Sequence, residues 1–137
     1  MKIRYLVATG LIIIGFIVHA VGGELTDMKS LLVTGMADTI KIEIRAVWHL
    51  VSIDFIISAI FLILIQAKKT ISQNSLLVDF IGIRMFVYGL VFLLLILFSK
   101  SKLLFQVPQW ILLLCIGILL EWGRLSKLFK KRLIKKP

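Results

Sequence analysis

Four apolar stretches, each long enough to cross a lipid bilayer, constrain the fold of this chain more than any other feature. They cover about residues 3–21, 46–66, 76–98 and 107–128. A helix of about 20 residues crosses a hydrocarbon core roughly 30 Å thick. Because backbone polar groups have no water to bond within that core, such stretches favour helices over isolated strands. The sequence therefore predicts one domain over residues 1–137, an all-α integral membrane protein built as a four-transmembrane-helix bundle.

Composition supports this prediction. Hydrophobic residues make up 60% of the 137 residues, and the mean hydropathy is +1.04. A soluble domain of this length has too small an interior to hide so much apolar surface, so lipid must cover the remainder. The first stretch, with Lys2 and Arg4 ahead of it and the small-residue site 18–20 near its end, also resembles a signal peptide. We interpret it as a true span.

The basic residues are divided unequally between the two ends of the predicted spans. Eleven lie before the first stretch, between the second and third, or after the fourth, whereas five lie at the opposite ends. Cytoplasmic loops of membrane proteins carry the excess of lysine and arginine. The sequence therefore predicts an N-in/C-in orientation with both termini in the cytoplasm. The predicted location is a cell membrane, the bacterial inner membrane, crossed several times.

The connection over residues 22–45 is the only long one, and it is predicted to be an outer loop. Within it, five residues recur at helical spacing and suggest a short amphipathic helix on the membrane surface: Met28, Leu31, Leu32, Gly35 and Met36. Residues 39–44 alternate with period two, but a lone strand has no partner. We therefore expect residues 39–44 to extend the second helix outward, with Asp38 as its cap.

The net charge of +10 concentrates after the fourth stretch, in a basic tail over residues 124–137. Its seven basic residues are Arg124, Lys127, Lys130, Lys131, Arg132, Lys135 and Lys136. A basic run directly after a hydrophobic span is typical of a segment that contacts anionic lipid headgroups. The run is not interleaved with aromatic and polar residues, so the predicted partner is an anionic bilayer and not nucleic acid.

Charged residues inside the stretches form a predicted polar cluster. At about 1.5 Å per residue, Asp54 lies near the bilayer middle, and Arg84 and Glu121 lie at comparable depths. One guanidinium can hold carboxylates from two neighbouring helices. Ser58 and Tyr88 follow Asp54 and Arg84 by four residues, so each continues the polar face of its helix. The cluster is either a proton, ion or substrate site within the membrane, or an ion pair that fixes helix packing, which is the commoner case.

Two histidines form a second candidate site. His19 lies near the outer end of the first stretch and His49 near the outer start of the second, at similar depth. Opposed imidazoles from two helices can bind haem b, so a haem on His19 and His49 is one option. Hydrogen-bonding histidines at the membrane surface are the other. No metal site is predicted, and the single cysteine, Cys115, is interpreted as a small apolar residue.

Glycines recur on the predicted spans at positions that suit close helix contacts. Gly82 and Gly89 are seven residues apart on the third stretch, and Gly117 lies in the fourth. Small residues let helix backbones approach in a membrane, where water does not drive helices together. We expect these glycines to mark helix–helix contacts.

The sequence contains no pattern that fixes a reaction. Catalytic triads, carboxylate pairs at enzyme spacing, phosphate-binding loops and zinc spacings are all absent, so no enzymatic activity is predicted. The preferred hypothesis is a subunit of an oligomeric transporter or of a larger membrane complex. One alternative is a membrane-embedded redox protein or enzyme that uses His19 and His49, and another is a structural or assembly partner.

Overall fold

A computed structural model describes most of the chain. The described residues are 3–67, 75–99, 104–105 and 107–134, with Ser75 and residues 127–134 described by their backbone only. This part of the chain contains helices and no strand. Four helices are long and apolar enough to cross a membrane: Ile3–Leu32, Asp38–Ala67, Leu76–Ser99 and Gln109–Ser126. The prediction of an all-helical chain with four apolar helices is therefore confirmed.

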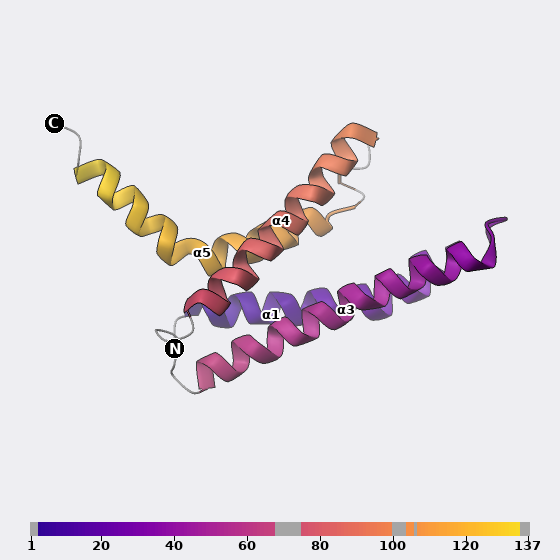
Figure 1. Cartoon of the computed structure of the whole chain (residues 1–137), viewed down its shortest axis with the longest axis horizontal. Helices are drawn as coiled ribbons and strands as arrows, with labels where there is room; N and C mark the ends of the chain where they lie inside the picture. The colour runs from indigo at the N-terminus through magenta and orange to yellow at the C-terminus, as the bar shows by residue number, and fades with distance from the viewer. Residues whose placement is uncertain (1–2, 68–74, 100–103, 106, 135–137) are drawn as a thin grey trace. The chain divides into compact units, whose positions relative to one another are not determined.

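The first of these helices is continuous but not uniform (Figure 1). It consists of α1 (Ile3–Ile17), the wider π-helical segments η1 (Val18–Gly22) and η2 (Glu24–Met28), and α2 (Lys29–Leu32). The other helices are α3 (Asp38–Ala67), α4 (Ser75–Ser99) and α5 (Gln109–Ile134). The chain divides into two compact units, which are described separately: Thr9–Leu64, and Met1–Ala8 together with Ile65–Pro137.

The structure corrects the predicted loop over residues 22–45. The first helix continues to Leu32 and α3 already begins at Asp38, so only residues 33–37 connect the two. The predicted start of the second helix at Asp38 is confirmed. The separate amphipathic helix is not, because Met28, Leu31 and Leu32 belong to the continuation of the first helix.

Local hydrogen bonds explain why the first helix does not end at its two glycines. The Gly23 N–H donates to the carbonyl of Val18, five residues earlier, which is the pattern of a π-helical turn. Thr26 Oγ1 donates to the Gly22 carbonyl at 2.9 Å and Ser30 Oγ donates to the Thr26 carbonyl at 2.8 Å. The polar residues of this segment thus stabilise its helical turns.

In the unit that contains α4 and α5, these two helices pack side by side through glycines (Figure 1). A methyl group added at Gly117 would lie 2.7 Å from Phe86 Cβ and 2.9 Å from the Gly82 carbonyl oxygen. One added at Gly89 would lie 2.9 Å from the backbone nitrogen of Leu114. The predicted close contacts at these glycines are therefore confirmed, and no larger side chain fits without moving a backbone.

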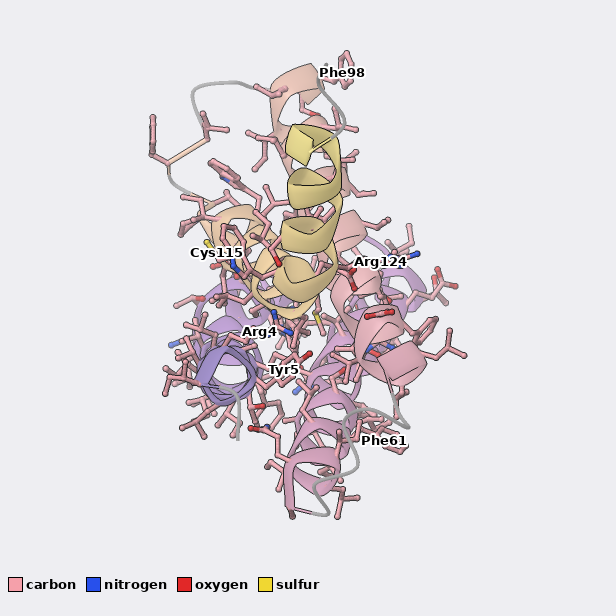
Figure 2. All side chains as sticks on the ribbon, turned by 90° about the vertical axis from the view of Figure 1, so that its left-hand side faces the viewer. Arg4, Tyr5, Phe61, Phe98, Cys115 and Arg124 are labelled. Atoms are coloured by element: carbon pink, nitrogen blue, oxygen red, sulfur yellow. The ribbon has the colours of Figure 1, made fainter. Side chains whose placement is uncertain are left out.

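The start of α1 belongs to the same unit as α5. Arg4 Nη2 donates to the Tyr5 hydroxyl at 2.9 Å, and the guanidinium carbon lies 4.7 Å from the centroid of that ring. Figure 2 shows both side chains. The guanidinium lies so close to Gly123 that any side chain there would overlap it. Gly123 thus provides the space that the Arg4 side chain occupies.

Large apolar side chains project outward from the helices of both units (Figure 2). Phe61 on α3 is 44% exposed and Phe98 at the end of α4 is 85% exposed. Cys115 is also exposed, on α5. Such extensive apolar exposure along long helices is what a lipid-facing surface requires and what a water-facing surface avoids.

Candidate functional site

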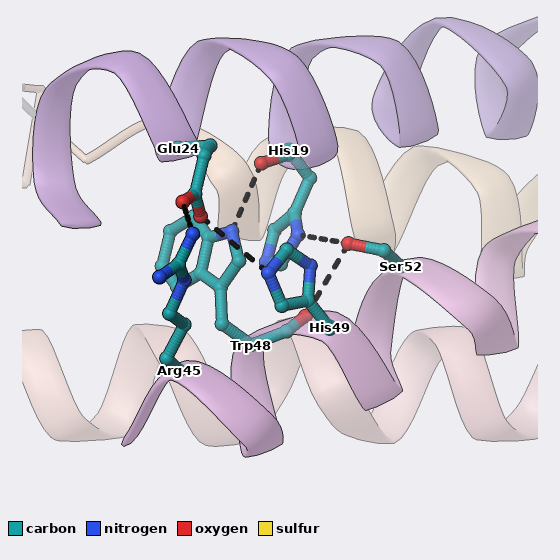
Figure 3. A network of polar contacts seen from close by, with 6 residues as sticks. All are labelled: His19, Glu24, Arg45, Trp48, His49 and Ser52. Carbon is teal, nitrogen blue, oxygen red and sulfur yellow. Dashed lines mark hydrogen bonds and ion pairs between the residues drawn. The ribbon is translucent and has the colours of Figure 1, made fainter. Parts of the chain in front are cut away.

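The unit Thr9–Leu64 contains a network of polar contacts between the first helix and α3, the hairpin network (Figure 3). Its members are His19, Glu24, Arg45, Trp48, His49 and Ser52. The four from α3 follow one another at intervals of three, one and three residues, so they share one side of that helix. The network therefore joins two helices that are each long enough to cross a membrane.

His19 is held mainly by Trp48. The imidazole and indole rings are stacked, with centroids 4.0 Å apart and an angle of 16° between the planes. Trp48 Nε1 donates to the His19 carbonyl at 3.0 Å, and the ring of Phe55 meets the imidazole edge to face at 6.0 Å. One tryptophan thus fixes both the backbone and the ring of His19.

Ser52 contacts both His19 and Trp48. The Ser52 hydroxyl lies 3.3 Å from the Trp48 carbonyl, and His19 Nδ1 lies 3.1 Å from the same Oγ. The serine thus holds the Nδ1 edge of the imidazole, and the tautomer of His19 decides which of the two groups donates.

Glu24 connects the basic residues of α3. Its Oε1 pairs with Arg45 Nη2, and its Oε2 lies 3.5 Å from His49 Nε2. The side chains are partly exposed, with values of 28% for Glu24, 47% for Arg45 and 45% for His49. Glu24 contacts both Arg45, which is permanently charged, and the imidazole of His49. A change of charge on His49 would therefore alter the electrostatic interaction between Glu24 and Arg45.

Close packing at Gly23 brings the two sides of the network together. A Cβ atom at Gly23 would overlap the Trp48 indole, so a larger residue there would displace the indole from its present position. Gly23 lies between η1 and η2. Wide turns of this kind occur disproportionately at functional sites.

The residues of the network suit proton exchange better than metal binding. Glu24, His19 and His49 can each take up or release a proton, while Arg45 stays charged. Over the residues that the structure describes, no group of three or more His, Cys, Asp or Glu residues could hold a metal ion.

The structure brings both predicted histidines into one network but gives them different partners. His19 contacts Trp48 and Ser52, whereas His49 directs Nε2 toward Glu24. The haem option stays a prediction, and a Soret band in the absorption spectrum of the purified protein would establish it. Sequence reasoning missed Glu24 and Arg45 as site residues, although their charges beside the two predicted histidines were a usable signal.

The predicted cluster around Arg84 has local contacts in each unit. In the unit with α3, Ser58 Oγ donates to the Asp54 carbonyl at 2.7 Å. In the unit with α4 and α5, the Arg84 guanidinium carbon lies 5.4 Å from the ring centroid of Phe80. Tyr88 is 38% exposed. Pairing of Arg84 with Asp54 stays a prediction.

Glu121 lies at the tight contact of α5 with α4. A Cβ atom at Gly82 would lie 3.0 Å from Glu121 Oε1. This oxygen is buried and has no hydrogen-bond partner among the described residues. The assistance that Glu121 was expected to give to Arg84 stays a prediction.

Of the predicted lipid-headgroup residues, Arg124 is the one whose side chain the structure describes. Its Nη1 lies 4.0 Å from Asp79 Oδ2, and the side chain is 62% exposed. The side chains of Lys127, Lys130, Lys131 and Arg132, and the whole of Lys135 and Lys136, lie outside the described residues. The predicted contact of the tail with lipid stays a prediction.

No protein-family model, no curated protein and no solved structure matches this chain. The function must therefore be inferred from the contacts described above.

Proposed function

We propose that this chain is a multi-pass membrane protein that forms an oligomeric transporter linked to proton movement. The hairpin network is the proposed site of proton exchange. A bacterial inner membrane with both termini in the cytoplasm is the proposed setting, because the basic residues are divided so unequally between the helix ends.

One observation carries this proposal. Three titratable side chains and one arginine from two membrane-length helices lie in two adjacent groups of contacts, beside two π-helical segments. Glu24 and His49 are partly exposed, so they have access to the water from which a proton would come. Ser52 holds the Nδ1 edge of His19, and Glu24 contacts both His49 and Arg45. The histidines and Glu24 can therefore take up and release a proton, and Arg45 can stabilise the negative charge of Glu24.

Oligomerisation follows from the size of the chain. Four helices with small residues at their contacts enclose little interior, so a conducting path forms more easily between copies of the chain than within one. Exposed apolar side chains remain on every long helix and provide surface for such contacts.

Reconstitution tests the proposal directly. The purified protein is placed in vesicles of phosphatidylcholine and phosphatidylglycerol that enclose a pH-sensitive dye, and a potassium gradient with valinomycin sets the membrane potential. We expect proton flux above that of protein-free vesicles, and we expect Glu24→Gln to lower it toward the protein-free rate. Glu43→Gln is the matched control, because Glu43 is an exposed acid of α3 that is not a member of the network. Flux that is unchanged in Glu24→Gln would contradict the role of the network.

The orientation is tested by thiol labelling. In a Cys115→Ala background, a cysteine at Ser30 should react with an impermeant reagent added to intact cells, and one at Ser126 should not. Ser30 is exposed near the end of the first helix, and Ser126 lies near the opposite end of the fourth span. The reverse pattern would show that the termini face outward.

A further inference from the structure

A shallow groove lies on the surface of the unit that contains α4 and α5. It is lined by Leu76, Leu77, Asp79, Phe80, Ile83 and Arg124. Four of these six residues are apolar, and the other two are a carboxylate and a guanidinium. The groove thus combines an apolar trough with one charge of each sign.

Each charged residue lies at the edge of the apolar part of its helix. Asp79 is the first charged residue of α4, and Arg124 is the first basic residue of the tail over residues 124–137. Charged side chains at such edges meet lipid headgroups when the helices cross a membrane. Phe80 and Ile83 follow Asp79 toward the span interior, which is where the acyl chain of a lipid in this groove would lie.

The charged pair is open enough to bind a ligand. Arg124 Nη1 and Asp79 Oδ2 are 4.0 Å apart, and the side chains are 62% and 31% exposed. A direct hydrogen bond between them would be about 2.7–2.9 Å long. At this distance Arg124 and Asp79 do not form a direct hydrogen bond. The N–H groups of Arg124 and the carboxylate oxygens of Asp79 can therefore bind a ligand.

We propose that this groove binds a zwitterionic phospholipid with a primary ammonium headgroup, namely phosphatidylethanolamine. Arg124 binds the phosphate, Asp79 accepts a hydrogen bond from the ammonium group, and an acyl chain lies along Phe80 and Ile83. Each headgroup charge is opposite in sign to the side chain that it would contact. The inference does not depend on proton transport, and it differs from the expected attraction of the basic tail to anionic lipid.

Asp79 is the residue that selects the headgroup. An anionic lipid such as phosphatidylglycerol carries the same phosphate but no ammonium group to offset the charge of the Asp79 carboxylate. Phosphatidylcholine has the same net charge as phosphatidylethanolamine, but its quaternary nitrogen has no N–H to donate. The basic tail attracts these two neutral lipids equally, so a difference between them reports on the groove.

Native mass spectrometry of the full chain in detergent tests the proposal. The protein is titrated with an equal mixture of dioleoyl phosphatidylethanolamine and dioleoyl phosphatidylcholine. We expect the first to be bound about fivefold more, the size of effect at the upper end for a solvent-exposed ion pair. Asp79→Asn should bring this ratio close to one while total lipid binding is kept. Arg124→Gln should lower binding of both lipids, because both carry the phosphate.

Two matched variants in the other unit serve as controls. Asp27→Asn and Lys29→Gln change the net charge by the same amounts at exposed positions and should leave the ratio and the total unchanged. Circular dichroism checks that every variant keeps its helix content. Equal binding of the two lipids by the unmodified chain would overturn the proposal without any variant. A preference that survives Asp79→Asn would overturn the role of the carboxylate, and unchanged lipid binding in Arg124→Gln would overturn that of the arginine.

Discussion

Helices α4 and α5 approach each other through glycines, whereas the first helix and α3 are joined by aromatic stacking, hydrogen bonds and ion pairs. In the first pair, Gly82, Gly89 and Gly117 bring the backbones together. In the second pair, Gly23 leaves space for the Trp48 indole, and polar groups make most of the described contacts. Lipid is as apolar as the helices, so shape and polar contacts replace the hydrophobic effect as the cause of association. In this chain, close fit of shape joins α4 and α5, and polar contacts join the first helix and α3.

The two kinds of contact should differ in how they respond to change. A glycine contact fails when one carbon is added, because a backbone atom of the neighbour occupies the space. Polar contacts near a helix end are partly exposed, so water can replace a lost partner at small cost. Substitutions should therefore cost more in the glycine-packed pair than in the hairpin network.

The largest effect is expected for Gly117→Ala. The added methyl would meet the Phe86 nitrogen at 2.8 Å and the Gly82 oxygen at 2.9 Å, and neither backbone atom can move alone. Overpacking of this kind typically costs about 1–3 kcal/mol of the free energy of unfolding. Reversible unfolding in mixed micelles measures this free energy. Gly10→Ala is the control, because a methyl there has nothing within 4 Å. Equal stability of the two variants would show that α4 and α5 are not closely packed.

A somewhat smaller effect is expected for Gly23→Ala. The methyl would overlap the Trp48 indole, which is a side chain and can rotate away at the expense of its contacts with His19. We expect a loss of about 1–2 kcal/mol, within the range for overpacking. The neighbouring Gly22→Ala is the control, since its methyl would lie 3.9 Å from Val18 Cγ1, an ordinary contact. Trp48 fluorescence should change in the first variant and not in the second.

The smallest effect on stability is expected for Glu24→Gln. The substitution removes ion pairs with Arg45 and His49, whose side chains are nearly half exposed. Exposed pairs contribute about 0.2–1 kcal/mol, and salt weakens them further. Asp27→Asn should cost less still. A loss from Glu24→Gln larger than that from Gly117→Ala would reverse the comparison and make the polar contacts the stronger of the two kinds.

Much of the fold could be predicted because it depends on local pattern. The lengths of the apolar stretches predict the four helices, Asp38 predicts the start of α3, and the glycines of α4 and α5 predict their contact. The continuation past Gly22 could not be predicted, because paired glycines followed by an acid usually end a helix. Here Gly23 faces Trp48 and Glu24 faces Arg45, which are 25 and 21 residues further along the chain. Such distant partners leave no periodic signal in the sequence.

The π-helical segments also set the rotation of everything that follows them. In an α-helix each residue turns the chain by about 100°. A wider turn takes up an additional residue without turning the rest of the helix, as the Gly23–Val18 hydrogen bond does here. Deleting one residue from 18–22 would let regular turns form and would leave every side chain outside the segment intact. It would also keep Glu24 facing Arg45 and His49. A regular α-helix with the present number of residues would instead turn Glu24 by about 100° from them, so the wide turn is itself a determinant of the site.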